Sequence, residues 1–156
     1  MKVELVNFAA RNCHEYGPAL LYRAVKFSRD NDLDSDPETL YQTMAYEMMR
    51  ENPDMIVLAA IERKKVVGHL LARVVNIDGT IMILVTQLEI DKKYRDGRQD
   101  TILNGFDIIK QFAASKETNK IRCWAMNENV AKIFERLGFK PKSHILMDAV
   151  MEEEDG

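Results

Sequence analysis

Apolar and polar residues alternate over 3–8, which predicts a short strand. In the rest of the first third of the chain, hydrophobic residues recur every three to four positions, a spacing that predicts helices. The apolar residues between His14 and Asp30 fall on one helical face. Proline suits only the first turn of a helix, because it lacks an N–H group and clashes with the preceding turn. Pro18 therefore predicts that this helix begins near Gly17.

A second helix is predicted from the stretch that follows. Asp36 is a natural N-cap, and Pro37 suits the first helical position. Leu40, Met44 and Met48 lie four residues apart, so they share one face of this helix. That face is expected to pack against the core.

The spacing of apolar residues changes from four to two in the middle of the chain. Three stretches rich in Val, Ile and Leu occupy 55–62, 66–76 and 80–90 and are separated by short polar turns. This pattern predicts three antiparallel strands joined by hairpins. Several of these stretches are apolar on both faces, which is typical of a sheet that helices cover on each side.

The last third of the chain alternates between the two spacings. It predicts a helix over 100–116, a strand over 121–126, a helix over 127–139 and a final strand over 144–151. The resulting order is β-α-α-β-β-β-α-β-α-β. It predicts an α/β (α+β) fold in which a mixed central sheet of about six strands carries helices on both faces, within a single domain over 1–156.

Composition and charge narrow the classes of function. The net charge of -3 argues against non-specific binding to nucleic acid, so we expect no nucleic-acid partner. No apolar stretch reaches the roughly 18 residues of a membrane helix, and the N-terminus lacks the apolar run of a signal peptide, so we expect a cytoplasmic protein without a membrane partner. The two cysteines and three histidines show no metal-ligand spacing, so we expect no metal.

The segment NENVAKIFERLGF (127–139) carries the stronger of two resemblances to a known family. Its Asn and Gly are good cap residues for the two ends of a helix. The segment resembles the penultimate helix of the GNAT superfamily of acyl-CoA-dependent N-acyltransferases. The residues in register are Asn127, Phe134, Leu137, Gly138 and Phe139. Together with the order of elements, this resemblance implies the GNAT fold and acyl transfer from acetyl-CoA.

The segment QLEIDKKYRDGRQDTIL (87–103) is similar to the loop with which this family holds coenzyme A. The resemblance implies that backbone N–H groups at the start of the following helix bind the pyrophosphate. It also implies that the strand before the loop pairs its backbone with the pantetheine arm. The residues that the resemblance assigns to the cofactor are Leu88, Ile90, Arg95, Asp96, Gly97, Arg98, Gln99, Asp100, Thr101, Asn127 and Phe134.

Two residues of this loop depart from the family's pattern. Arg98 and Asp100 occupy positions that are normally small. Arg98 adds a cation that can hold a phosphate. Asp100 can cap its own helix, and its carboxylate then competes for the N–H groups that the pyrophosphate needs. We therefore predict a degraded phosphate loop that binds acetyl-CoA weakly or not at all.

The positions that the resemblance assigns to catalysis also depart from the pattern. Where the family often has a Glu on the fourth strand as general base, this chain has Gln87, which cannot accept a proton. Glu89, two residues along on the same strand face, is the nearest substitute, and a solvated acid at the strand end is the alternative interpretation. Phe134 stands where the family often has a Tyr that protonates the departing thiolate.

Two functions stay open. The resemblance implies an N-acyltransferase that moves an acetyl group from acetyl-CoA to a primary amine, on a small molecule or on a protein. The alternative is a catalytically impaired protein of the same fold that serves as a binding or structural module, because the departures fall on the positions that matter most for chemistry. Members of the family often dimerise, so the resemblance also suggests a homodimer.

Overall fold

The computed structural model of the protein describes residues 3–9, 12–31, 33, 36–92, 99–142 and 145–151, without the side chains of Gln99 and Asp100. Five strands and four helices are formed within this part of the chain. In chain order they are β1 (Glu4–Asn7), α1 (Cys13–Asp30), α2 (Pro37–Met49), β2 (Met55–Glu62), β3 (Lys65–Ile77), β4 (Thr80–Ile90), α3 (Gln99–Ser115), β5 (Ile121–Cys123) and α4 (Glu128–Arg136).

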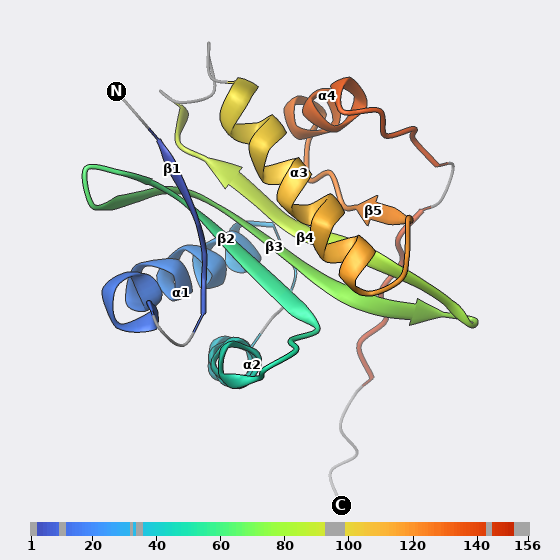
Figure 1. Ribbon diagram of the computed structural model, residues 1–156. Helices are drawn as coiled ribbons and strands as arrows, with labels where there is room; N and C mark the ends of the chain where they lie inside the picture. Colours follow the sequence, from blue (N-terminus) through green and yellow to red (C-terminus); the bar gives the residue numbers. More distant parts are fainter. Residues whose placement is uncertain are drawn as a thin grey trace, which may run out of the picture.

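The strands form one mixed sheet between two layers of helices, as the sequence predicts (Figure 1). The order across the sheet is β1-β2-β3-β4-β5. The first four strands are antiparallel to their neighbours, and β5 runs parallel to β4 after the crossover through α3. The predicted bounds of β2 and β4 are confirmed, and β3 extends one residue further at each end.

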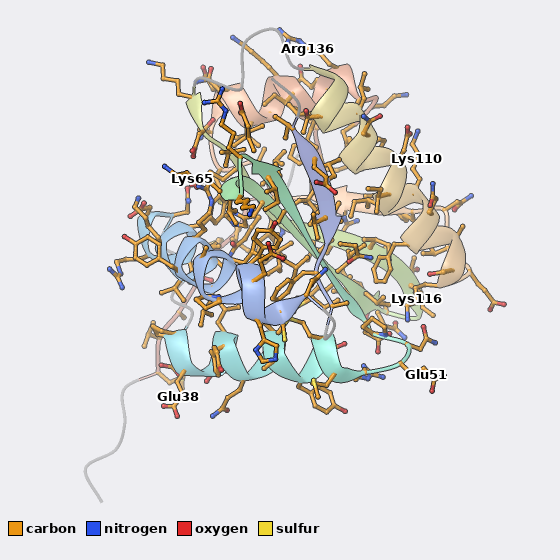
Figure 2. The ribbon with its side chains drawn as sticks, turned by 60° about the vertical axis from the view of Figure 1, so that its left-hand side comes forward. Glu38, Glu51, Lys65, Lys110, Lys116 and Arg136 are labelled. Atoms are coloured by element: carbon orange, nitrogen blue, oxygen red, sulfur yellow. The ribbon has the colours of Figure 1, made fainter. Side chains whose placement is uncertain are left out.

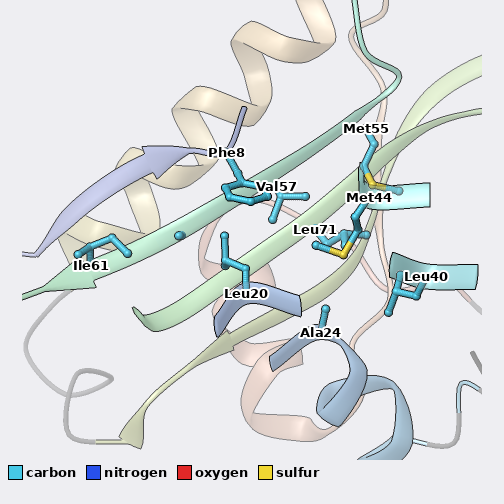
Figure 3. Close-up of a cluster of buried hydrophobic side chains, with 10 residues drawn as sticks. Phe8, Leu20, Ala24, Leu40, Met44, Met55, Val57, Ile61 and Leu71 are labelled. Atoms are coloured by element: carbon cyan, nitrogen blue, oxygen red, sulfur yellow. The ribbon is translucent and has the colours of Figure 1, made fainter. Parts of the chain in front are cut away.

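Each face of the sheet buries its own hydrophobic cluster. One cluster joins α1 and α2 to β2 and β3 through Leu20, Ala24, Leu40, Met44 and Leu71 (Figure 3). The cluster on the opposite face joins α3 and α4 to the same strands and to β4. Alternate residues of β2 therefore enter different clusters, which explains why the strand is apolar throughout.

The start of α1 differs from the prediction. The helix begins at Cys13 and not near Gly17, so Pro18 lies inside it. Cys13 and Tyr16 pack against the same cluster as Leu20, because they continue its helical spacing toward the N-terminus. This packing outweighs the intrahelical hydrogen bond that Pro18 cannot donate.

The predicted N-terminus of α2 is confirmed. The Asp36 carboxylate accepts hydrogen bonds from the Thr39 N–H at 3.1 Å and from the Thr39 hydroxyl at 2.7 Å. These bonds hold the pKa of Asp36 below its usual value. Pro37 occupies the first helical position.

The predicted end of α4 is also confirmed. Gly138 has φ of +99°, which favours glycine, and its N–H donates to the Glu135 carbonyl at 3.0 Å. The chain then turns Phe139 back onto the core, where its ring centroid lies 5.0 Å from that of Phe134 and 5.3 Å from that of Phe106. Gly138 thus ends α4 and allows Phe139 to pack against the core.

Two predictions for the C-terminal third are wrong. The strand expected over 121–126 has only three residues, Ile121–Cys123, and these are half-buried and not buried. No strand forms over 145–151, the described part of the segment 144–151. The described sheet therefore has five strands and not six.

The end of α3 is tied to the loop before β2. The Lys116 ammonium lies 3.2 Å from Asp54 Oδ1 and 3.0 Å from Asn52 Oδ1 (Figure 2). The hydrogen bond from Lys116 lowers the pKa of Asp54. Among the described helices, none is long and apolar enough to cross a membrane.

Candidate functional site: a gap between β4 and β5

The strands β4 and β5 stay paired over a short distance only. β4 has eleven residues, yet β5 pairs with just three of them, Ile83 to Val85. The last hydrogen bond across this pair runs from the Trp124 N–H to the Val85 carbonyl at 3.1 Å. Within the described residues, no strand pairs with β4 beyond Val85 on this side. The second half of β4 therefore borders a gap in the sheet.

The backbone of Leu88 faces this gap. The Asp91 N–H donates to the Val67 carbonyl at 2.8 Å, so Asp91 directs its backbone groups toward β3. Backbone groups alternate in direction along a strand, and Leu88 lies three residues before Asp91. Leu88, which is opposite Leu70 in the register, therefore directs its N–H and C=O away from β3 and toward the gap. The sequence prediction of Leu88 as a backbone contact is consistent with this geometry.

An apolar pocket lies beside the gap, under α3 and α4. The side that α3 contributes includes Thr101 and Gly105, and α4 contributes Phe134 and Leu137. Ile90, another predicted contact, also lines the pocket and is buried. An apolar pocket thus lies next to a strand whose backbone groups face the gap, an arrangement that suits an extended chain containing amide groups.

Gly68 in β3 allows β3 and β4 to approach each other closely at the pocket. A Cβ atom at Gly68 would lie 2.8 Å from the Glu89 carbonyl oxygen and 3.2 Å from Ile90 Cα. Both atoms belong to the backbone of β4, so a side chain at this position would push β4 away from β3. Gly68 also lines the pocket. The shape of the site therefore depends on a residue that the sequence analysis did not single out.

Gln87 lies on the opposite face of the sheet, under α1. Its side-chain oxygen is 2.8 Å from His69 Nε2, and its side-chain nitrogen donates to the Ala24 carbonyl at 3.3 Å. Gln87 and His69 are both buried, and the His69 ring packs edge-on against Phe27. Both ends of the Gln87 amide are therefore occupied within the fold, and Gln87 joins α1 to the sheet.

The imidazole of His69 is held in its neutral form. Burial is the main cause that lowers the pKa of His69 to about 4, and the Arg23 charge acts in the same direction. The hydrogen bond with Gln87 opposes this shift but is the smaller effect. Because Gln87 Oε1 can only accept, His69 Nε2 carries the proton.

We expect the stability of the protein to fall in mild acid because of His69. Above pH 6.5 this histidine is neutral in the folded and the unfolded chain. Below pH 6.5 the unfolded chain binds the proton first, so the free energy of unfolding falls until the pH reaches the folded pKa of about 4. The loss is about 3 kcal/mol over this window, at roughly 1.4 kcal/mol per pH unit.

Chemical denaturation at several pH values measures this loss. His69→Gln should flatten the dependence between pH 6.5 and 4, whereas His14→Gln should not, because His14 is exposed. An equal slope in the wild type and in His69→Gln would show that His69 does not cause the acid sensitivity.

Glu89 belongs to an ion-pair cluster at the end of β4. Its carboxylate lies 2.8 Å from a guanidinium nitrogen of Arg23, on α1. Arg23 also contacts Asp91 at 3.1 Å and the Val66 carbonyl at 3.4 Å. Glu89 therefore has a cationic partner, and its carboxylate lies toward α1 like the Gln87 amide, although Glu89 is also among the residues that line the pocket. The polar groups of both predicted catalytic residues thus have partners on the α1 side.

The remaining predicted site residues fall into two groups. Asn127 is the N-cap of α4, where its side-chain oxygen accepts from the Val130 N–H at 3.0 Å, and Phe134 is buried. The residues Arg95, Asp96, Gly97 and Arg98 lie outside the described part of the chain, as do the side chains of Gln99 and Asp100. The backbone of α3 begins at Gln99, so Asp100 lies one residue inside the helix and not at the position before it.

Sequence reasoning missed Arg23 as a residue of the site. Arg23 follows Leu20 by three residues and precedes Phe27 by four, so it shares the core-facing side of α1 with them. A cation on an apolar helix face is costly unless it has partners, and this is a signal for carboxylates nearby. The partners themselves, 66 and 68 residues away in sequence, could not be identified from the sequence.

Comparisons with known proteins rest on structure alone. No known family profile matches the sequence, and no curated protein matches it. Many solved structures share its fold. A predicted acetyltransferase from Clostridium acetobutylicum, solved with acetyl-CoA, superimposes with a TM-score of 0.75 at 11% identity, over 98% of this chain and 99% of that one.

Two further structures are those of acetyltransferases with named acceptors. An aminoglycoside acetyltransferase from an uncultured soil metagenomic sample, in complex with sisomicin, has a TM-score of 0.65 at 14% identity and 97% coverage of both chains. A ribosomal-protein-alanine N-acetyltransferase from Brucella melitensis biovar Abortus 2308 has a TM-score of 0.60 at 16% identity, over 95% of this chain and 100% of that one. At these identities the comparisons establish the fold.

Proposed function

The chain has the fold of the GNAT acetyltransferases, and on this premise we propose that it is an N-acyltransferase that moves an acetyl group from acetyl-CoA to a primary amine. The gap between β4 and β5 carries this proposal. An extended, amide-containing arm can pair with the backbone of Leu88 there, as an added strand would. The neighbouring solved structure with acetyl-CoA supports the choice of co-substrate.

The residues around the gap fit an acyl-pantetheine arm. The pocket is lined mainly by apolar residues, together with Thr101, His69 and Glu89. The arm's amides find a backbone donor and acceptor at Leu88. Acetyl-CoA supplies an acyl group that is already activated as a thioester. The protein's contribution is to hold this group beside the amine, and proximity of this kind can supply much of the rate.

In this proposal, no strong base on β4 accepts the proton of the amine. Gln87 cannot accept a proton, and its amide is engaged by His69 and Ala24. The Glu89 carboxylate is engaged by Arg23. A water molecule in the gap can take the proton instead, without the roughly 10²- to 10⁴-fold contribution of a positioned general base. We therefore expect slow turnover.

A second candidate function is a binding module that keeps the co-substrate site and lacks catalysis. This candidate is favoured because two positions that often carry catalytic groups in proteins of this fold carry none here. The Gln87 side chain is buried and hydrogen-bonded within the fold. Phe134 is buried against Phe139 and has no hydroxyl group. Both positions serve the stability of the fold.

Two measurements on the wild-type protein separate these candidates. Acetyl-CoA at a concentration of 100 times Kd should raise the free energy of unfolding by about 2.7 kcal/mol for either function. Release of free coenzyme A in the presence of a panel of primary amines, small molecules and peptides, should occur only for the enzyme. Stabilisation without release of coenzyme A would support the binding module, and no stabilisation at any concentration would contradict both.

A further inference from the structure

A second pocket lies at the β1 edge of the sheet, away from the gap between β4 and β5. Its volume is about 190 Å³, and it lies between α2 and the start of β2. A cavity of about 150 Å³ can hold a benzene molecule, so this pocket has room for one aromatic side chain. Methionine side chains adapt to such rings and make favourable contacts with them. The apolar side chains that line the pocket include Phe8, Met44, Met48, Met55 and Phe112.

The backbone of Met55 faces outward at this edge. The Val74 N–H donates to the Asp54 carbonyl at 2.8 Å, so Asp54 directs its carbonyl toward β3. Because backbone groups alternate in direction along a strand, Met55 directs its N–H and C=O away from β3. Val57, two residues further along, faces the same way and accepts a hydrogen bond from the Phe8 N–H at 2.9 Å. Met55 thus presents an N–H and a C=O with which no described strand pairs on this side.

The chain turns away from this edge after Phe8. The Ala9 N–H donates to Asn12 Oδ1 at 2.9 Å, and Asn12 Nδ2 donates to the Asn7 carbonyl at 3.0 Å. These bonds form the turn that leads into α1, so they draw the end of β1 away from β2. Within the described residues, the position opposite Met55 therefore stays open.

We propose that this pocket binds a short extended peptide of a partner protein, with an aromatic residue opposite Met55. The N–H and C=O of that residue pair with those of Met55, as in an added strand. In such a pair the two side chains lie on the same face of the sheet. Met55 belongs to the cluster under α1 and α2 (Figure 3), so the aromatic ring enters the pocket beside it. This docking site is separate from the gap and does not depend on acyl transfer.

Charge at the mouth of the pocket favours a basic residue next to the aromatic one. Arg50 pairs with Glu47 at 3.1 Å and with Asp54 at 3.2 Å. Lys116 pairs with Asp54 at 3.2 Å and lies at the same corner of the molecule as Glu51 (Figure 2). Glu51 lines the pocket, is exposed, and has no cationic partner among the described residues. An acid without a partner, beside two cations that have theirs, attracts a basic side chain and repels an acidic one.

Hydrogen bonds hold the wall of the pocket in place. Glu47 Oε2 accepts from the Asp54 N–H at 2.8 Å, which joins the end of α2 to the residue before β2. Lys116 joins the end of α3 to the same loop through Asn52 and Asp54. A wall that is fixed from both helix layers loses little freedom when a peptide binds.

NMR titration with a blocked tripeptide tests the proposal. The probe has phenylalanine at its centre and arginine on both sides, so it carries no primary amine and cannot serve as an acetyl acceptor. We expect the amide signals of Met55 and Phe8 to shift and that of Leu88, in the gap, to stay unchanged. Glutamate in place of both arginines, alanine in place of phenylalanine, or methylation of the phenylalanine nitrogen should each weaken binding at least about fivefold.

Two pairs of variants locate the binding site. Met48→Trp should fill the pocket and lower the affinity for the tripeptide at least about tenfold, whereas Met49→Trp should not, because Met49 is 75% exposed. Glu51→Lys should weaken binding about fivefold or more. Glu38→Lys, at the other end of α2 (Figure 2), should leave it unchanged. The two charge variants change exposed side chains, so they test binding without disturbing the core.

Three results would overturn the proposal. The first is the absence of a shift at Met55 with millimolar tripeptide, or equal binding of the tripeptide with alanine at its centre. The second is a set of shifts centred on Leu88, which would place the peptide in the gap. The third is binding of toluene as tight as that of the tripeptide, with no effect of methylation, which would indicate a pocket for small apolar molecules instead.

Discussion

A proline at position 88 should weaken the binding of acetyl-CoA by more than about tenfold while the protein stays folded. Leu88 directs its N–H toward the gap and not toward β3, so Leu88→Pro removes no hydrogen bond from the β3–β4 pair. Proline is tolerated in strands at such outward-facing positions. Its ring replaces the donor and fills the space in which the pantetheine arm would pair. One lost hydrogen bond is worth up to about 1.5 kcal/mol, and the bulk of the ring adds to this, so the affinity should fall by more than about tenfold.

Leu88→Ala is the matched control for this variant. It removes most of a side chain that is half-buried against the cluster under α3, but it keeps the backbone N–H. Its thermal stability should fall, and its affinity for acetyl-CoA should stay near that of the wild type. Isothermal titration and circular dichroism measure the two properties separately. If Leu88→Pro binds acetyl-CoA as tightly as Leu88→Ala, the backbone of β4 does not hold the arm.

Asp100→Asn should tighten the binding of acetyl-CoA by about tenfold or more. The backbone of Asp100 forms part of the first turn of α3, where free N–H groups would face a pyrophosphate. A carboxylate roughly 4 Å from a phosphate charge costs about 1 to 4 kcal/mol, depending on the effective dielectric constant. The change to Asn removes the charge and keeps the size. Its cost to the helix is a few tenths of a kcal/mol at most, since Asn and Asp have similar helix propensities.

Arg98→Ala should have the opposite effect, if the guanidinium acts as a counter-ion of the phosphates. Titrations at low and at moderate salt show whether the two effects are electrostatic, because salt screens both of them. Asp107→Asn is the control, since Asp107 is an exposed acid further along α3. Tight binding by the wild type that Asp100→Asn leaves unchanged would show that the phosphate loop is intact.

Local patterns in the sequence predicted most of the architecture. The strands over 55–62 and 80–90 were located to the residue, because three hairpin-linked apolar runs leave few alternatives for register. The caps at Asp36, Asn127 and Gly138 were also correct, since each depends on bonds within a few residues. These features are properties of short segments.

The errors arose where distant contacts override local preference. α1 begins four residues earlier than Gly17, because Cys13 and Tyr16 find a hydrophobic cluster that other elements build. The segment 145–151 has the composition of a strand, but a strand needs a partner, and the segment pairs with no strand in the described part of the chain. Composition alone cannot show whether such an edge is available.

The sequence predicted a location for the site but not the interactions of the residues there, and the location stays a prediction. The backbone contact at Leu88 followed from the resemblance, and the gap beside β4 is consistent with it. The roles of Gln87 and Glu89 could not be found in the same way. Their partners, His69 and Arg23, are brought to them by the antiparallel pairing of β3 with β4 and by the packing of α1 on the sheet.

The most direct test of the central claim is amide hydrogen exchange of β4, followed by NMR with and without saturating acetyl-CoA. The Glu89 amide faces β3 in the free protein, whereas the Leu88 amide faces the gap. If the acyl-pantetheine arm pairs with β4, acetyl-CoA should slow the exchange of Leu88 at least about tenfold and leave Glu89 nearly unchanged. Unchanged exchange at Leu88 in a protein saturated with acetyl-CoA would contradict the account.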